Sequence, residues 1–171
     1  PEQCRHCVTA PYKDVADMYV EGAIVIDEPT GAVLYTDKTK ELTIDQANEV
    51  KETCPYNIPR RDEDTGLVTK CDMCIDRVQA GMLPICVKTC CTGTMNFGER
   101  DAMLKLAEER LASVKKTHPK AELLDVDALN VIYLVTQPRT MYYEFAERKA
   151  DPMTRKQLLA KFGKPVKRLF G

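Results

Sequence analysis

The order of apolar and polar residues predicts a β-hairpin and a helix in the first third of the chain. Two alternating runs, at residues 23–27 and 32–36, are separated by a short segment that ends in Gly31. That spacing, with a glycine in the connection, is typical of a β-hairpin. The pattern over residues 43–53 favours a helix, and Pro55 ends it because proline cannot continue a helix.

The last third of the chain carries the clearest helical pattern. Over residues 99–117, acidic side chains occupy the first turn, lysines occupy the last, and one face is apolar. We interpret this face as ordinary packing; it consists of Met103, Ala107, Leu111 and Val114. A continuous apolar run at residues 131–135 predicts a buried strand. The basic tail from Arg148 onward, with a short helix expected over 153–162, is typical of a segment that contacts a partner.

Composition narrows the class of protein. The chain has 171 residues, of which 44% are hydrophobic and 30% charged, with a formal net charge of −1. This balance excludes a disordered chain and lacks the basic excess typical of nucleic-acid binding. No apolar run approaches the roughly 20 residues needed to cross a bilayer, and no leader sequence is visible. The chain opens on Pro1 and not on methionine, so we expect residues to precede it.

Cysteine has to carry the chemistry, because eight cysteines stand against two histidines. The strongest motif is a Cys-x-x-Cys pair, Cys71 and Cys74, followed after residues 75–85 by the Cys-x-x-x-Cys pair Cys86 and Cys90. A Cys-x-x-Cys turn directs two sulfurs inward, a further cysteine closes the site, and the last thiolate can bind a neighbouring cluster. Soft thiolates suit iron–sulfur clusters. The motif therefore predicts iron–sulfur sites.

Three other uses of the cysteines are open on the residues alone, and each fits less well. Structural zinc usually takes a second Cys-x-x-Cys pair about 15–20 residues on, whereas the closing pair here is Cys-x-x-x-Cys. Disulfides are disfavoured because Cys90 and Cys91 are neighbours and the Cys-x-x-Cys turns make poor staples. A thioredoxin-like redox motif would need a single such pair.

Four stretches around the cysteines are informative beyond their spacing. They are Gln3-Cys4-Arg5-His6-Cys7, Cys54-Pro55-Tyr56-Asn57-Ile58-Pro59-Arg60, Lys70-Cys71-Asp72-Met73-Cys74-Ile75-Asp76-Arg77, and Pro84-Ile85-Cys86-Val87-Lys88-Thr89-Cys90 with Thr92-Gly93-Thr94-Met95-Asn96-Phe97-Gly98. Together they resemble the iron–sulfur subunits of molybdenum- or tungsten-dependent formate dehydrogenases, above all the small subunit of the soluble enzyme of sulfate-reducing bacteria. The resemblance covers about residues 1–145.

The resemblance implies an α+β fold of bacterial ferredoxin-like lobes around iron–sulfur clusters, with a β-hairpin insertion and a C-terminal helix and strand extension. Residues 1–98 would form the iron–sulfur region, as two lobes at 1–60 and 61–98. Residues 99–171 would form the helical extension and a tail that contacts a partner. The first cysteine motif of the family would precede Pro1, and the complete subunit would hold three [4Fe-4S] clusters.

The resemblance also implies which cysteines act together in the second half of the iron–sulfur region. Cys71, Cys74 and Cys86 would hold one cluster, whose fourth ligand comes from an upstream motif. Cys90 would bind the neighbouring cluster. Each motif of the family lends its last cysteine to its partner's cluster in this way.

Cys4 and Cys7 would hold a third cluster, with Cys54 supplied from across the lobe. Here the chain departs from the family, because Tyr12 stands where another cysteine ligand is expected. Tyrosinate, water or another group would then complete this site. Cys91 replaces a proline that normally follows the last ligand; we expect a spare buried thiol or an alternative ligand.

A second departure from the family involves four ligand positions that have changed together. Ala16, Ile44, Ala47 and Val50 occupy four more positions at which the family has cysteine ligands. Their joint replacement implies that one whole cluster has been lost and that apolar side chains fill its place.

Other polar residues near the cysteines have weaker claims. We expect His6, between Cys4 and Cys7, to face solvent or a partner. Four cations flank the cysteines and either raise cluster potentials or are ordinary surface charges; they are Arg5, Lys13, Lys70 and Arg77.

The resemblance implies a subunit that is not catalytic alone. It would relay electrons from a large molybdopterin or tungstopterin subunit that oxidises formate to a cytochrome or similar acceptor. The alternatives are the equivalent subunit of another molybdopterin reductase and a zinc-stabilised binding module. The location implied is the periplasm, reached with a signal-bearing partner, with the cytoplasm as the alternative.

Overall fold

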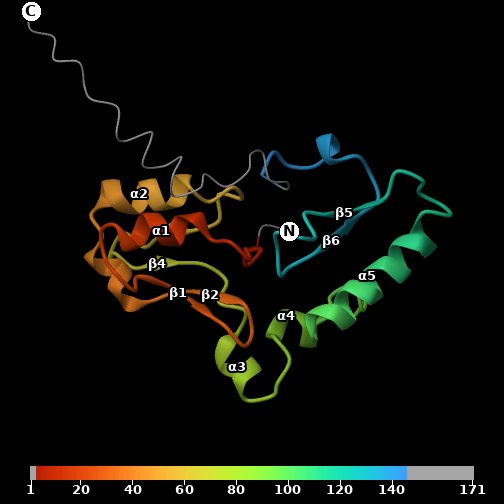
Figure 1. Cartoon of the computed structure of the whole chain (residues 1–171), viewed down its shortest axis with the longest axis horizontal. Coiled ribbons are helices and arrows are strands. Elements are labelled where there is room, and N and C mark those ends of the chain that lie inside the picture. The colour runs from red at the N-terminus through yellow and green to blue at the C-terminus, as the bar shows by residue number, and fades with distance from the viewer. Residues whose placement is uncertain (1–2, 146–171) are drawn as a thin grey trace, which may run out of the picture.

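The computed structural model describes residues 3–145 and has a mixed architecture of short helices and small sheets (Figure 1). Its elements in chain order are α1 (Pro11–Asp17), β1 (Ile24–Asp27), β2 (Ala32–Tyr35), the 3₁₀ helix η1 (Asp37–Glu41), α2 (Ile44–Glu52), β3 (Arg60–Arg61), β4 (Val68–Thr69), α3 (Ile75–Gln79), α4 (Ile85–Lys88), α5 (Arg100–Val114), β5 (Glu122–Leu124), β6 (Tyr133–Val135) and the 3₁₀ helix η2 (Arg139–Met141). In this part of the chain the strands pair as three antiparallel two-stranded sheets. The tail from Arg148 and the helix expected over 153–162 lie outside the described residues.

The predicted β-hairpin is present as β1 and β2. Ile24 lies opposite Tyr35, and Asp27 lies opposite Ala32. Gly31 closes the turn at φ +67°, a left-handed conformation that glycine adopts without steric cost. Ile24 and Ala32 have no exposed surface, so the hairpin forms one wall of the core.

Helix α2 begins and ends where the sequence predicts. The backbone N–H of Thr43 donates to Gln46 Oε1 at 2.9 Å, and the N–H of Gln46 donates to Thr43 Oγ1 at 3.3 Å. This capping box satisfies two backbone donors that a helix start leaves without intrahelical partners. Ala47 and Val50 are buried, and α2 packs against α1.

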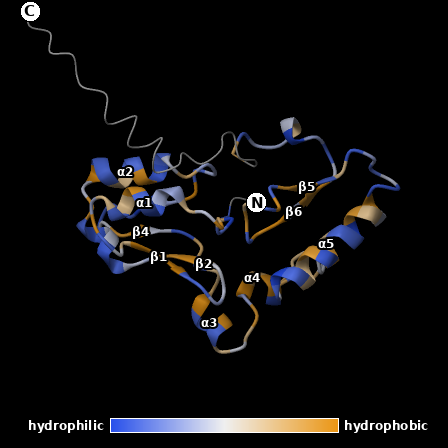
Figure 2. Ribbon diagram, viewed as in Figure 1, coloured by the Kyte–Doolittle hydropathy of each residue, from blue (hydrophilic) through white to orange (hydrophobic). Residues whose placement is uncertain are grey.

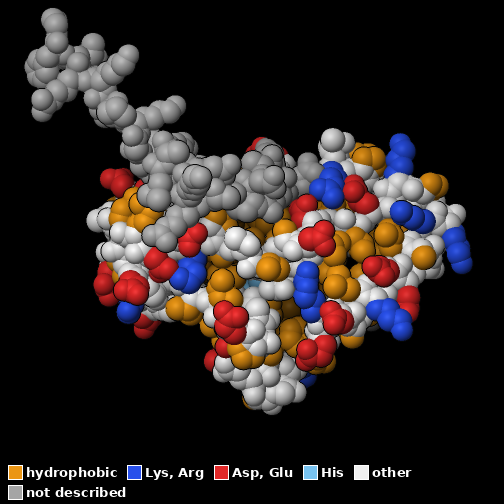
Figure 3. All heavy atoms as spheres, viewed as in Figure 1, with side chains coloured by type: hydrophobic (Ala, Val, Ile, Leu, Met, Phe, Trp, Pro, Cys, Tyr) orange, Lys and Arg blue, Asp and Glu red, His pale blue; other side chains and the backbone are white. Residues whose placement is uncertain are grey.

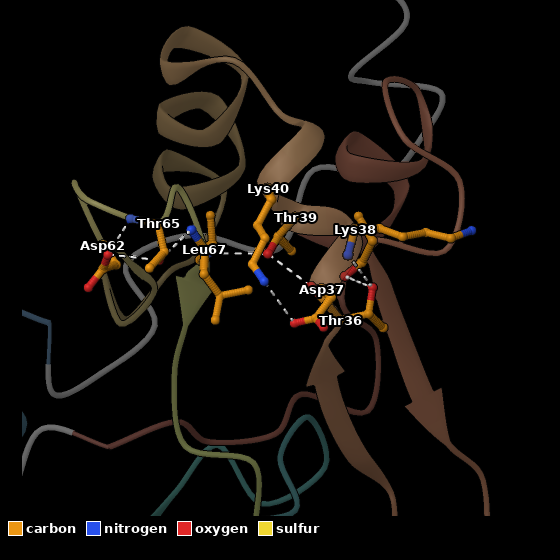
Figure 4. Close-up of polar contacts among 10 residues, drawn as sticks. Thr36, Asp37, Lys38, Thr39, Lys40, Asp62, Thr65 and Leu67 are labelled. Carbon is orange, nitrogen blue, oxygen red and sulfur yellow. Dashed lines mark hydrogen bonds and ion pairs between the residues drawn. The ribbon is translucent and has the colours of Figure 1, made fainter.

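Thr39 connects η1 to β4 (Figure 4). Its hydroxyl donates to the carbonyl of Thr36 at 2.9 Å and accepts from the N–H of Val68 at 3.1 Å, and the side chain is fully buried. The turn before β4 is held by Asp62, whose carboxylate accepts the N–H and the hydroxyl of Thr65, each at 2.7 Å. A polar segment is thereby fixed against the core.

Fully buried side chains lie mostly in the first half of the chain. One cluster joins residues of α1, the β1–β2 hairpin, α2 and β4. In contrast, α3, α4 and α5 contribute no fully buried residue. Figure 2 shows apolar positions on α3 and α4, away from this cluster. The apolar side chains of these helices are therefore partly open to solvent.

The C-terminal predictions are confirmed in outline and corrected in detail. The helix expected over 99–117 is α5, and its predicted apolar face is half-buried, not core. The strand expected over 131–135 is only β6, where Val135 alone is fully buried. Its partner β5 was not predicted. This sheet has only two strands and packs on α5 from one side, so most of its side chains stay half-exposed.

The start of the chain joins the two halves of the molecule. The N–H of Val131 donates to the carbonyl of Arg5 at 3.0 Å, and the N–H of Asn130 donates to the carbonyl of His6 at 3.0 Å. Figure 1 shows this N-terminal segment beside β5 and β6. Among the described helices, none is long and apolar enough to cross a membrane.

Candidate metal centres

The structure divides the predicted ligands into two groups with opposite surroundings. The N-terminal cysteine group is buried and consists of Cys4, Cys7 and Cys54. The C-terminal cysteine group is exposed or half-buried and consists of Cys71, Cys74, Cys86 and Cys90. All eight cysteines have free thiols, which agrees with metal ligation and not with a disulfide framework.

Elements distant in sequence build the N-terminal cysteine group. The N–H of His6 donates to Cys4 Sγ at 3.4 Å, within a turn where His6 has φ +47°. Cys54 follows the end of α2, and backbone N–H groups of Ile58 and Tyr56 donate to its sulfur. Burial raises the pKa of the Cys54 thiol, and the nearby Cys4 adds to this effect. The thiols of this group thus lie close enough to interact electrostatically.

Tyr12 lies within this group, at the start of α1. It is 2% exposed, and its hydroxyl forms a hydrogen bond with the thiol of Cys7. Burial, and then the charges of Cys7 and Cys4, raise the pKa of the Tyr12 hydroxyl. The hydroxyl is therefore a neutral donor beside Cys7 and Cys4. Its ring lies 6.2 Å from the ring of Tyr35, measured between centroids.

Two buried atoms of this region have no hydrogen-bond partner among residues 3–145: His6 Nε2, whose residue lies between Cys4 and Cys7 in the chain, and Tyr35 Oη. Nδ1 of His6 accepts the N–H of Val33 at 3.0 Å, so the proton of the neutral ring sits on Nε2. Burial, and then the charge of Lys70, lower the pKa of His6 to about 3, which keeps the ring neutral.

The Tyr35 hydroxyl interacts electrostatically with all three cysteines of the N-terminal cysteine group. Burial, and then Cys54, Cys4 and Cys7, raise the pKa of Tyr35 well above its usual value. A buried donor without an acceptor costs about 1–3 kcal/mol, and the sulfurs of an iron–sulfur cluster would supply acceptors. The free thiols and the unpartnered Tyr35 hydroxyl fit such a cluster.

The C-terminal cysteine group is built from turns around α3 and α4. Met73 and Cys74 both have positive φ, and Asp72 Oδ1 accepts the N–H of Cys74 at 2.8 Å. This local bond holds a left-handed turn that is costly for residues other than glycine. Cys86 lies in α4, immediately after the helix start set by Pro84.

Cys90 lies in a polar turn after α4. Its thiol lies 3.4 Å from the hydroxyl of Thr92 and 3.3 Å from that of Thr94. Hydrogen bonds from these hydroxyls, that of Thr92 first, and from the backbone N–H of Met95 lower the pKa of Cys90 to about 6. The thiolate, which is the form that binds metal, is then the main species at neutral pH.

Tyr133 links the two groups. Burial raises its pKa, Arg5 opposes this, and Cys71, Cys4 and Cys86 raise it further. The pKa of the Cys71 thiol is also raised, by partial burial and then by the nearby Cys4. Thiols of both groups therefore interact electrostatically with the Tyr133 hydroxyl.

The arrangement is not that of a preformed site for a single ion. Within residues 3–145, no three His, Cys, Asp or Glu side chains converge as one ion requires. Zinc takes four ligands at about 2.0–2.3 Å around one point. An iron–sulfur cluster takes one thiolate at each iron, so its ligands stand further apart.

Two expectations about these loops are wrong. His6 is fully buried instead of facing solvent, because the positive φ turns its side chain inward to meet the hairpin. Cys91 is exposed and is not a buried spare thiol, because the polar turn after α4 lies at the surface.

Of the four apolar residues at the departed ligand positions, three are buried as expected; the loss of a cluster itself stays a prediction. Ala16, Ala47 and Val50 lie together in the buried cluster of the first half. Ile44 is 65% exposed and takes no part. At 100° per residue, it lies about 120° around α2 from Val50, on the solvent side.

Sequence reasoning missed Tyr35 and Tyr133 as part of the sites. The alternation of the hairpin indicated that Tyr35 shares a face with Val33. For Tyr133 no local signal existed, because its contact with Arg5 joins residues at opposite ends of the described chain.

Comparison with known proteins bears on this geometry. Residues 1–100 match the family model of the 4Fe-4S dicluster domain. The chain is 60% identical over 146 residues to the formate dehydrogenase 2 subunit beta (cytochrome c-553) of Nitratidesulfovibrio vulgaris. It is 44% identical over 146 residues to the formate dehydrogenase subunit beta of Megalodesulfovibrio gigas. Each alignment covers 85% of this chain and 67% of the relative.

A more distant likeness is local. The nitrate-inducible iron–sulfur subunit of formate dehydrogenase from Escherichia coli is 52% identical over 62 residues, 36% of this chain and 21% of that subunit. Two matches over most of the chain and one over part of it lead to the same group of proteins. The chain therefore belongs to the 4Fe-4S dicluster family and is a homologue of the beta, or iron–sulfur, subunits of formate dehydrogenases.

Proposed function

We propose that this chain is the electron-transfer subunit of a formate dehydrogenase, relaying electrons one at a time through [4Fe-4S] clusters. The observation that carries the proposal is the 60% identity to a formate dehydrogenase beta subunit over 85% of this chain. The two cysteine groups support it, since they supply separate sets of free thiols within the matched region.

The proposed ligands follow the two groups. Cys4, Cys7 and Cys54 hold one cluster, with Tyr12 beside it. The C-terminal cysteine group holds a second through Cys71, Cys74 and Cys86, and Cys90 binds a neighbouring cluster. Such a cluster, when bound, accepts and releases single electrons. The chain fixes the position of each cluster and supplies the hydrogen bonds and charges that set its potential.

Formate oxidation itself would fall to a partner. We propose a large subunit with a pterin-bound tungsten or molybdenum centre as the electron donor, and a cytochrome or similar carrier as the acceptor. The printed name of one relative, which includes cytochrome c-553, supports that kind of acceptor. We further propose a periplasmic location, reached together with a signal-bearing partner; the likeness to the family is its support.

The test is made on the native complex, purified without oxygen. We expect iron and acid-labile sulfide in equal amounts, and broad visible absorption that bleaches when formate is added. Bleaching by another oxoanion or organic substrate, but not by formate, would assign the chain to a different molybdopterin enzyme. A colourless, zinc-containing complex would overturn the proposal altogether. Fractionation of whole cells tests the location separately.

A further inference from the structure

Four cations flank the cysteines in sequence, and they differ in burial and in the groups that they contact. Lys13 forms an ion pair with Asp17 on α1. Arg77 and Lys70 donate hydrogen bonds to backbone carbonyl groups. Arg5 alone of the four is buried, with 3% of its surface exposed. A buried cation acts on its neighbours with little screening by water or salt, so its charge has the longest reach of the four.

Arg5 is held between aromatic rings. Its guanidinium carbon lies 3.3 Å from the centroid of the Tyr133 ring and 5.3 Å from that of Tyr56. Such stacking is favourable for a planar cation, and most so where water is excluded. An arginine keeps its charge in such a place. The carbonyl of Arg5 also accepts the N–H of Val131, which fixes the backbone beside the ring.

The stack lies between the two cysteine groups. Arg5 follows Cys4 in the chain and so lies next to the N-terminal cysteine group. Tyr133, on which it stacks, interacts electrostatically with Cys71 and Cys86 as well as with Cys4. Arg5 therefore stacks on the ring that interacts electrostatically with thiols of both groups.

The opposing charge nearby is already shared. Asp125 interacts with Arg5, but its carboxylate also accepts from Arg139 Nη1 at 3.2 Å and from Tyr56 Oη at 3.2 Å. Arg139 in turn pairs with Glu122 at 3.1 Å. Asp125 therefore also serves Tyr56 and Arg139, and does not face Arg5 alone.

We propose that Arg5 is a positioning residue that raises the reduction potentials of the clusters at both cysteine groups. Each cluster gains one electron, and no proton, on reduction, so its charge becomes more negative by one unit. A fixed buried cation stabilises that reduced state more than the oxidised state. The inference rests on the proposed cluster sites, and it adds a shared electrostatic control that couples them.

The test is a redox titration of the intact complex, followed by EPR, with Arg5→Gln, Arg5→Lys and the surface control Lys13→Gln. In Arg5→Gln we expect the reduced-to-oxidised ratio at a fixed potential to fall about tenfold, which corresponds to about 59 mV for one electron. Arg5→Lys keeps the charge and should restore most of the ratio, and Lys13→Gln should leave it unchanged. Equal potentials in Arg5→Gln and the native complex, with full iron content, would overturn the proposal.

A second variant keeps the proposal testable if Arg5→Gln fails to retain iron. Asp125→Asn removes the opposing charge, leaves Arg5 in place and keeps oxygen and nitrogen atoms for Tyr56 and Arg139. It should shift both potentials upward, and no shift would contradict the proposal. Titration with a chemical reductant answers this question whether or not formate reduces the complex, so failure of the proposed function is recognised separately.

Discussion

The N-terminal and C-terminal cysteine groups contain the same chemical group in different surroundings. Cys4, Cys7 and Cys54 are at most 9% exposed, and Cys7 and Cys54 belong to the main apolar cluster. The C-terminal cysteine group lies around α3 and α4, which contribute no buried residue. In the space-filling view, apolar and charged side chains are interspersed over the visible face of the molecule (Figure 3).

The difference in burial indicates what holds the side chains of each cysteine group in place. Packing of α1, α2 and the hairpin holds the first group in place before any cluster binds, because a core fixes side chains in single rotamers. The second group is held by local turns, so its order depends on the bound cluster and on whatever covers it. Burial and hydrogen bonds to sulfur also set cluster potentials, so the two groups should differ electronically.

The largest expected effect is loss of a cluster from the buried group. Cys54→Ser removes a thiolate that the core places beside Cys4, so one cluster's complement of iron and sulfide should be lost. The control is Cys91→Ser, since Cys91 is exposed and has no assigned site. The content of iron and acid-labile sulfide per complex is measured for both variants. A loss of iron in Cys91→Ser would make Cys91 a ligand.

The next effect concerns the fourth position of the same site. Tyr12→Cys places a thiol where the buried phenol now donates to Cys7. We expect cluster absorbance in air to decay about tenfold more slowly, a change of the size that ligand surroundings produce in metal sites. Tyr12→Phe is the matched control, because it removes only the hydroxyl. If Tyr12→Phe loses iron as Cys54→Ser does, tyrosinate is itself the ligand.

The sequence predicted the elements whose signals are local. The hairpin has its glycine turn, α2 has its cap, and α5 has its apolar face. What could not be predicted depends on contacts between distant residues. His6 turns inward because Val33 meets its ring, and Arg5 is buried because Tyr133 covers it. The cysteine motifs indicated the metal chemistry, but not which thiols would be buried.

A smaller effect compares two glycines in left-handed turns. Gly31 has φ +67°, and an added Cβ would lie 2.5 Å from Asn130 Nδ2, which donates to the carbonyl of Gly31 at 3.0 Å. Gly81 has φ +71°, with nothing within 4 Å of that Cβ. Both alanine variants strain the backbone by about 1–2 kcal/mol. Gly31→Ala should cost about 1 kcal/mol more, because it displaces Asn130 and its hydrogen bond.

Thermal unfolding followed by circular dichroism, on cluster-loaded protein without oxygen, measures this pair. The midpoint should fall further in Gly31→Ala than in Gly81→Ala. Equal shifts would mean that Asn130 moves aside at no cost, and that its bond does not hold the hairpin to the C-terminal half.

The smallest effect tests packing in the two regions with one matched change. Ile24 has no exposed surface, whereas Ile85 in α4 is 49% exposed. Loss of one methylene should cost about 0.5–1.5 kcal/mol in Ile24→Val and less than about 0.5 kcal/mol in Ile85→Val. The same unfolding measurement, made on the isolated chain and on the complex, separates two outcomes. If Ile85→Val becomes as costly as Ile24→Val only in the complex, a partner supplies the missing core around the C-terminal cysteine group. If the two variants already match in the isolated chain, the contrast between the regions fails.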